Sequence, residues 1–172
     1  MATTLADFGH VSDMRLRRLL TVWLDARGNQ TMPTRNDIDP AAAAELGSFL
    51  WLCDFERRER RFHYRMAGSG IARRHRDIVV GKYLDELLTG RALTRVTAYF
   101  SKVVEEPSIG FIGGRLYSDT ESPARGERLA LPLSDGAGSA RMILGATIET
   151  EWAAGVEAGL PDRQVIVFTP VY

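Results

Sequence analysis

The chain has 172 residues, which suits a single domain with short extensions. Hydrophobic residues make up 45% and charged residues 26%, and 22 basic side chains balance 22 acidic ones. This composition argues against intrinsic disorder and against a general affinity for polyanions, so we expect no nucleic-acid partner. No apolar stretch reaches the length of a membrane span and no signal peptide is evident, so we expect no membrane contact and a cytoplasmic location.

The neutral total is a cancellation between differently charged regions. Residues 57–76 hold eight arginines and a single acid, Glu59, so this stretch carries +7, whereas residues 1–56 carry −3. One interpretation is a solvated hairpin tip with no partner. The other is a docking surface, and the sequence does not decide between them.

The first part of the chain predicts a helical cap. Residues 1–10 show no periodicity, and we expect a flexible arm there. Apolar residues then recur at helical spacing as far as Gly28, and they are Leu16, Leu19, Leu20, Trp23 and Leu24. Asp39 is a typical N-cap and Pro40 a typical first helical residue, so a short helix begins there. We therefore take residues 11–46 as a cap and connector.

The next part, residues 47–150, predicts a sheet of five strands with helices inserted. Apolar residues alternate in two runs that indicate a β-hairpin, namely Phe49, Trp51, Cys53 and Phe55, then Phe62, Tyr64 and Met66. A helix is expected near 89–105, and three β-prone runs cover 108–117, 127–134 and 140–150. The last run is apolar on both faces, as in a central strand. In the C-terminal extension, residues 151–172, the run 164–168 is expected to add an edge strand or to reach a partner chain.

This order of elements describes an α+β fold of the PAS type, with helices between strands two and three. The residues that carry a closer resemblance are Trp23, Pro33, Arg35, Asp37, Asp39, Pro40, Asp54, Arg65, Gly68 and Gly81. On these residues the chain resembles a family of stand-alone PAS proteins of α-proteobacteria, and the R-x-D-I-D-P motif is its most specific part. The resemblance covers roughly residues 15–150 and implies a five-stranded antiparallel sheet under an N-terminal helical cap.

The resemblance implies a class of role and names no reaction. PAS domains sense small molecules or light, or act as dimerisation and docking modules, so we expect a sensory or regulatory protein that binds a ligand or a protein in signalling. The alternatives are a small-molecule enzyme that uses the same cavity and a docking module without ligand. Nucleophile, metalloprotease and phosphate-loop motifs are absent from the sequence. We therefore expect no enzyme.

A ligand pocket, if formed, is expected between the sheet and the helices from 71 to 105. Its candidate wall residues are Tyr64, Met66, Ile71, Phe100, Phe111, Leu131 and Leu144. The alternative is that these side chains fill a packed core. We expect no metal, since the metal-binding residue types are not clustered. The helix near 89–105 has no histidine and residues 70–76 have no cysteine, so we expect neither haem nor covalent flavin, which leaves open an unknown small apolar ligand.

Two further expectations concern contacts. Arg65 is expected to face the cap and to pair with Asp37, Asp39 or Asp54, which would clamp the connector to the sheet; the alternative is an exposed arginine. We also expect a homodimer, through either the Leu16–Leu24 stripe or the run 164–168, and a signalling protein as a partner.

Overall fold

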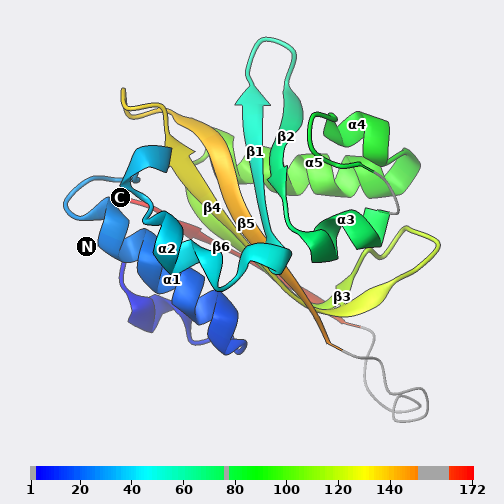
Figure 1. Cartoon of the computed structure of the whole chain (residues 1–172), viewed down its shortest axis with the longest axis horizontal. Coiled ribbons are helices and arrows are strands. Elements are labelled where there is room, and N and C mark those ends of the chain that lie inside the picture. The colour runs from blue at the N-terminus through cyan, green and yellow to red at the C-terminus, as the bar shows by residue number, and fades with distance from the viewer. Residues whose placement is uncertain (1–2, 76–77, 151–162) are drawn as a thin grey trace.

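The computed structural model describes residues 3–75, 78–150 and 163–172, and its centre is one antiparallel sheet of six strands (Figure 1). The strands are β1 Leu50–Glu56, β2 Arg61–Ala67, β3 Ser108–Leu116, β4 Ala124–Ser134, β5 Ala140–Thr150 and β6 Gln164–Pro170. The helices are α1 Met14–Arg27, α2 Pro40–Ala44, α3 Ser69–His75, α4 Leu84–Leu87 and α5 Gly90–Glu105. Short 3-10 helices cover Leu5–Phe8, Arg35–Asp37 and Gly47–Phe49.

The strand order is β2-β1-β5-β4-β3-β6, which confirms the predicted central position of the doubly apolar run. β5 lies between β1 and β4, so it is hydrogen-bonded along both edges. The sheet has one strand more than the five predicted, because β6 pairs antiparallel with β3, with Ile166 opposite Ile112. The run 164–168 is therefore an edge strand of the chain's own sheet.

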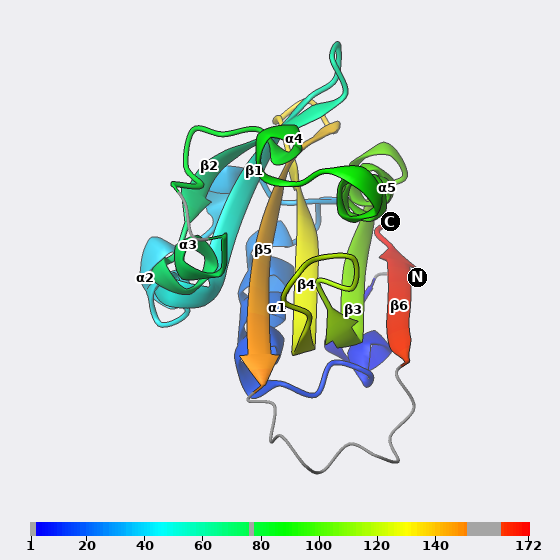
Figure 2. The same ribbon diagram turned by 90° about the vertical axis from the view of Figure 1, so that its right-hand side faces the viewer.

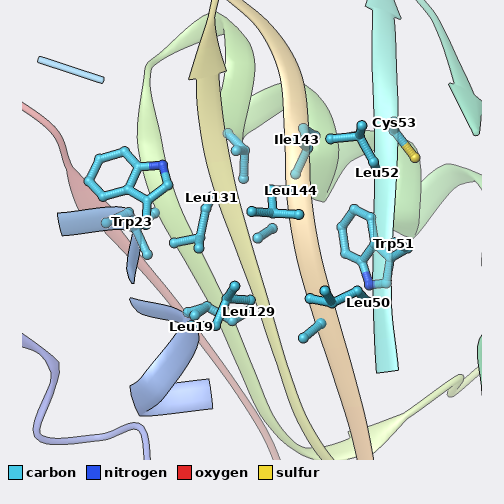
Figure 3. Packing of buried hydrophobic residues seen from close by; sticks show 14 of the residues in the cluster. Leu19, Trp23, Leu50, Trp51, Leu52, Cys53, Leu129, Leu131, Ile143 and Leu144 are labelled. Carbon is cyan, nitrogen blue, oxygen red and sulfur yellow. The ribbon is translucent and has the colours of Figure 1, made fainter. Parts of the chain in front are cut away.

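Helix α1 covers one face of the sheet, which we call the outer face (Figure 2). Leu16, Leu19 and Trp23 are completely buried, and the Trp23 indole Nε1 donates a hydrogen bond of 2.9 Å to the Pro132 carbonyl oxygen. Figure 3 shows Leu19 and Trp23 against Leu129 and Leu131 of β4. The apolar stripe of α1 is thus covered by the chain's own sheet, which removes it as the expected dimerisation surface.

The segment before α1 is packed rather than loose. Residues Leu5–Phe8 form a 3-10 helix, and Phe8 is completely buried in the core. The Thr3 carbonyl oxygen accepts a hydrogen bond of 2.9 Å from Arg27 Nη2, and the Thr3 hydroxyl donates to the Pro170 carbonyl oxygen at 3.2 Å. One aromatic anchor and these bonds explain why a segment without periodicity is ordered from Thr3 onward.

The connector after α1 follows its predicted caps. The Asp39 carboxylate accepts from the Ala41 amide at 2.9 Å, and Pro40 is the first residue of α2. Asp37 accepts from the Thr34 amide at 2.8 Å. The Pro33 carbonyl oxygen accepts from the Ser134 amide at 2.8 Å, so a backbone hydrogen bond holds the connector to β4.

The predicted clamp between Arg65 and the connector is not formed. Arg65 pairs with Asp54, one of its three expected partners, but this pair spans the β1–β2 hairpin and does not hold the connector, and the Arg65 side chain is 50% exposed. Asp37 and Asp39 are occupied by local backbone amides, so neither is available to it. Arg65 therefore joins two strands at the surface, and the alternative of an exposed arginine describes it better.

Candidate functional site

A cavity of about 420 Å³ lies on the inner face of the sheet, opposite α1. Helices α3 and α5, the loop after β3 and strand β6 contribute to its wall together with the central strands. The apolar part of the wall is formed mainly by Trp51, Tyr64, Ile71, Phe100, Ile112 and Phe168. Its volume is in the range of small-molecule sites, and its walls are mostly aromatic and aliphatic.

Trp51 of β1 forms the floor of the cavity. Its indole ring stacks on Phe100 at 5.0 Å between ring centroids, and it meets Tyr64 in an edge-on arrangement at 6.4 Å between centroids. The indole lies directly over Gly145 of β5, where an added Cβ would be 2.1 Å from a ring carbon. Gly145 thus leaves the space that lets the indole lie flat on the neighbouring strand.

The structure corrects the expected wall in part. Tyr64, Ile71 and Phe100 line the cavity. Met66 is half-buried and packs on the core outside the cavity.

The other three expected wall residues lie on the opposite face of the sheet. Phe111, Leu131 and Leu144 are buried without lining the cavity. Directly paired residues share a face, and Leu131 opposes Leu144 on the side of α1. The reason is that β5 is apolar on both faces, so its pattern does not tell which face is which.

Several wall residues were missed from sequence, among them Trp51, Tyr99, Ile112, Arg128, Thr147, Ile166 and Phe168. Arg128 and Thr147 point to the inner face because side chains alternate along a strand, and both line the cavity. The expected wall contained no charged residue there. Ile166 and Phe168 enter through β6, whose pairing with β3 was left open. The polar residues had a usable signal, since each interrupts an apolar β-run at the position that must face the cavity.

A polar corner adjoins Trp51. The Thr147 hydroxyl oxygen accepts from Trp51 Nε1 at 3.0 Å and from Arg128 Nε at 3.1 Å. Arg128 is 8% exposed, and its guanidinium lies 5.0 Å from the centroid of the Tyr117 ring. This corner therefore gathers hydrogen-bond donors inside an otherwise apolar wall.

Two buried tyrosines complete the polar side of the cavity. Burial raises the pKa of Tyr64 well above its usual value, and the positive charge of Arg128 acts in the opposite direction. Burial likewise raises the pKa of Tyr99, again against the effect of Arg128. Both hydroxyls are thus protonated at neutral pH. The Tyr64 hydroxyl bonds to Cys53, whereas the Tyr99 hydroxyl has no hydrogen-bond partner among the described residues.

The rim of the cavity is held by charged pairs. Arg95 of α5 and Asp119 of the loop after β3 form an ion pair of 2.6 Å. Tyr117, in the same loop, has a positive φ of 55°. The guanidinium of Arg74 lies 4.1 Å from the centroid of the Tyr117 ring. These contacts tie the loop to α5 on one side and to α3 on the other.

A family model for the PAS domain matches residues 11–148. The chain belongs to the PAS domain family. This membership confirms the predicted resemblance to PAS proteins and the predicted PAS fold, and it indicates a sensory signalling module. The match ends before β6, so the strand that supplies Ile166 and Phe168 to the cavity lies outside the matched residues.

Solved structures with a similar fold are LOV proteins at low identity. The Rhodobacter sphaeroides LOV protein is 14% identical, with a TM-score of 0.47 over 84% of this chain and 71% of that one. A variant of Vivid has 13% identity and a TM-score of 0.40 over 60% and 77% of the two chains. A light-oxygen-voltage domain described with a flavin analogue has 16% identity and a TM-score of 0.42 over 64% and 83%. No curated protein matches the chain.

The basic stretch of this PAS domain is largely paired with acids. Arg60 bonds Glu105 at 2.8 Å, Arg61 bonds Asp85 at 2.7 Å, and Arg74 approaches Glu149 at 3.5 Å. Arg60 and Arg61 lie at the exposed end of the first hairpin, so salt and water screen them further. This arrangement favours the interpretation of a solvated hairpin tip over that of a docking surface.

The predictions about metals and cofactors concern the residues around this site. Within residues 3–75, 78–150 and 163–172, no three His, Cys, Asp or Glu side chains gather as a metal site. Cys53 is completely buried and does not line the cavity, and burial raises the pKa of its thiol well above the usual value. That neither haem nor covalent flavin binds stays a prediction. No helix in the described part of the chain is long and apolar enough to cross a membrane.

Proposed function

We propose that this PAS domain senses a small molecule bound in the cavity between the inner sheet face and helices α3 and α5. The observation that carries the proposal is the cavity itself, about 420 Å³ with Trp51, Tyr64 and Phe100 in its wall. A packed core would leave no such space, because native interiors contain few voids larger than a water molecule. Binding an aromatic or aliphatic body there removes apolar surface from water on both partners.

The signal would leave the domain through the elements that touch both the ligand and the surface. Arg95 and Asp119 join α5 to the loop after β3 at the rim, so a ligand that displaces either element changes this pair. A ligand shifts a conformational equilibrium only by its differential affinity for the two states. Homodimerisation, a signalling partner and a cytoplasmic location remain predictions. For dimerisation, β6 stays the candidate surface, since Val165 is 51% exposed there.

The enzyme alternative is weaker on chemical grounds. Tyr64 and Tyr99 are buried tyrosines in the cavity wall, and burial raises the pKa of both, so both keep their protons at neutral pH. A general base must accept a proton near the operating pH, and neither tyrosine does. We therefore keep binding, and not catalysis, as the proposed use of the cavity.

A neutral fluorescent probe tests the proposal. N-phenyl-1-naphthylamine brightens when it enters an apolar site, and we expect saturable binding with stoichiometry of one per chain. Ala92 of α5 is buried and lines the cavity, so Ala92→Phe fills part of it and should weaken binding at least about tenfold, as expected when a pocket loses room for one ring. Ala44→Phe, at an exposed position of α2, is the matched control and should leave binding unchanged.

Two results would overturn the proposal. One is the absence of saturable binding by the wild-type chain. The other is equal binding by the wild type and the Ala92→Phe variant, since the probe would then occupy some other surface. Cooperative urea unfolding of each variant shows that the comparison is made between folded proteins.

A further inference from the structure

The cavity wall contains one cation that no described carboxylate neutralises. Arg95 pairs with Asp119 at 2.6 Å, and Lys102 pairs with Glu106, the residue that follows α5. Arg128 is 8% exposed, and its side chain contacts the Thr147 hydroxyl and the ring of Tyr117, neither of which is an anion. A guanidinium removed from water is strongly unfavourable unless an anion compensates it.

The acids nearest to this part of the wall have other arginine partners. Asp119 is bound to Arg95, and Glu149 lies 3.5 Å from Arg74. Glu127, the neighbour of Arg128 in β4, points to the outer face and accepts from the Asp13 amide at 2.9 Å. The positive charge at Arg128 is therefore left without a counter-charge among the described residues.

The guanidinium is held in place with its terminal nitrogens unused. Arg128 Nε donates to the Thr147 hydroxyl oxygen at 3.1 Å, and Trp51 Nε1 donates to the same oxygen. Neither Nη atom has a hydrogen-bond partner among the described residues. An arginine carries five N–H donors in a planar fork, so the fork keeps four of them for another group.

Tyr99 adds a second donor that lacks an acceptor. Its side chain is 4% exposed and lines the cavity, and its hydroxyl has no hydrogen-bond partner within the described part of the chain. A buried hydroxyl without a partner is rare in native structures and calls for an explanation such as a ligand. Tyr99 and Arg128 line the same cavity, and the positive charge of Arg128 opposes the dominant effect of burial on the pKa of Tyr99.

A group that satisfies both residues must accept several hydrogen bonds and carry a negative charge. A carboxylate does so, because its two oxygens match the planar fork of an arginine and can also accept from a phenol. The remaining wall is aromatic, with Trp51 and Phe100 stacked at 5.0 Å. It suits a flat apolar body attached to that carboxylate.

We propose that the cavity binds an organic anion, an aromatic or similarly flat apolar carboxylate, with its oxygens on Arg128 and Tyr99. This inference rests on the proposed function, since it names the chemical class of ligand for the same cavity. Arg128 is the residue that determines specificity, because it selects the anion over the neutral compound of the same shape. The aromatic wall binds both.

Two probes that differ by one charged group test this. 8-Anilinonaphthalene-1-sulfonate is N-phenyl-1-naphthylamine with an added sulfonate, whose oxygens stand in for the carboxylate. We expect the wild-type chain to bind the sulfonate at least about tenfold more tightly than the neutral probe, as one charge-assisted contact in a buried site allows. Arg128→Met should abolish this preference and leave binding of the neutral probe within about threefold.

Three further variants sharpen the result. Arg141→Met removes an exposed arginine that lies 3.6 Å from Asp135, outside the cavity, and should leave both affinities unchanged. Arg128→Lys keeps the charge and loses the fork, so it should retain part of the preference and serves if the Met variant fails to fold. Tyr99→Phe removes only the hydroxyl, and should weaken binding of the sulfonate by roughly three- to tenfold more than binding of the neutral probe.

The outcomes separate this inference from the proposed function. If the neutral probe binds and the sulfonate is not preferred, or if Arg128→Met keeps the preference, the anion site is wrong and the sensing cavity stands. If neither probe binds the wild-type chain, the proposed function itself is wrong and the anion site falls with it. A preference that depends on Arg128 but not on Arg141 supports both.

Discussion

The two faces of the sheet are built from the same strands and used in opposite ways. On the outer face, leucines of β4 pack against α1, and the Trp23 indole N–H donates to the Pro132 carbonyl oxygen. On the inner face, the same strand presents Arg128 to a cavity beside a tyrosine hydroxyl without a partner. The comparison shows how alternation along a strand lets one face supply stability while the other keeps space and unsatisfied donors for a ligand.

The largest effect should come from truncating the outer face. Leu131→Ala removes a completely buried side chain and should lower the free energy of unfolding by about 3–4 kcal/mol. Ile112, on the inner face, borders the cavity and lacks packing atoms on one side. Ile112→Ala should therefore lower the free energy of unfolding by only about 2 kcal/mol. Urea unfolding of both variants measures the difference. Equal losses would mean that the inner face is as tightly packed as the outer one.

Gly145→Ala tests the closest approach on the inner face. The new Cβ would lie 2.1 Å from the Trp51 ring, so the indole must move, at a cost of about 1–3 kcal/mol. The moved ring should also shift the tryptophan emission and weaken probe binding. Gly47→Ala is the control, since a Cβ there meets no atom within 4 Å and should change stability little.

Tyr99→Phe and Tyr64→Phe should change the stability of the chain in opposite directions. The Tyr99 hydroxyl is buried without a partner among the described residues, so its removal should raise the unfolding free energy of the ligand-free chain by about 1 kcal/mol. Tyr64→Phe removes a hydroxyl that bonds Cys53 and should lower it by a similar amount, about 1 kcal/mol. Thermal and urea unfolding of the two variants checks the opposite signs. A loss in both would show that Tyr99 is already satisfied.

The smallest effect is expected at the surface hairpin. Arg65→Ala breaks the pair with Asp54, but the Arg65 side chain is half exposed, so the free energy of unfolding should fall by about 0–1 kcal/mol. Added salt should reduce even this difference, because exposed charges are screened. A loss of several kcal/mol in a melting experiment would restore the idea that Arg65 clamps the cap.

Much of the fold could be predicted from periodicity and capping. The alternation from Trp51 to Phe55 and from Phe62 to Met66 gave the hairpin, and the Asp39–Pro40 pair gave the start of α2. The doubly apolar run 140–150 identified the central strand. These signals are local, since each depends on the direction of side chains within one element.

The site was harder to predict because it depends on pairing between elements. The orientation of β4 and β5 decides whether Leu131 or Arg128 faces the cavity, and an apolar pattern on both sides of β5 leaves that orientation open. Strand β6 joins the sheet by pairing with β3, which lies far away in the sequence, so the local pattern of β6 did not predict its neighbour. The partner of Arg65 was predicted only as one of three aspartates, because the pairing of β1 with β2 decides that Asp54 is the one beside it.

The sixth strand has a consequence for how such a domain could change its ligand over time. Alternate residues of β6, including Ile166 and Phe168, line the cavity, while the strand pairs with only one neighbour, β3. Substitutions at these two positions would change the shape of one wall of the cavity and leave the sequences of the central strands unchanged. The edge strand is therefore the part of the wall that can vary most independently of the core. A combinatorial library confined to positions 166 and 168 is a direct way to adapt the cavity to a new compound.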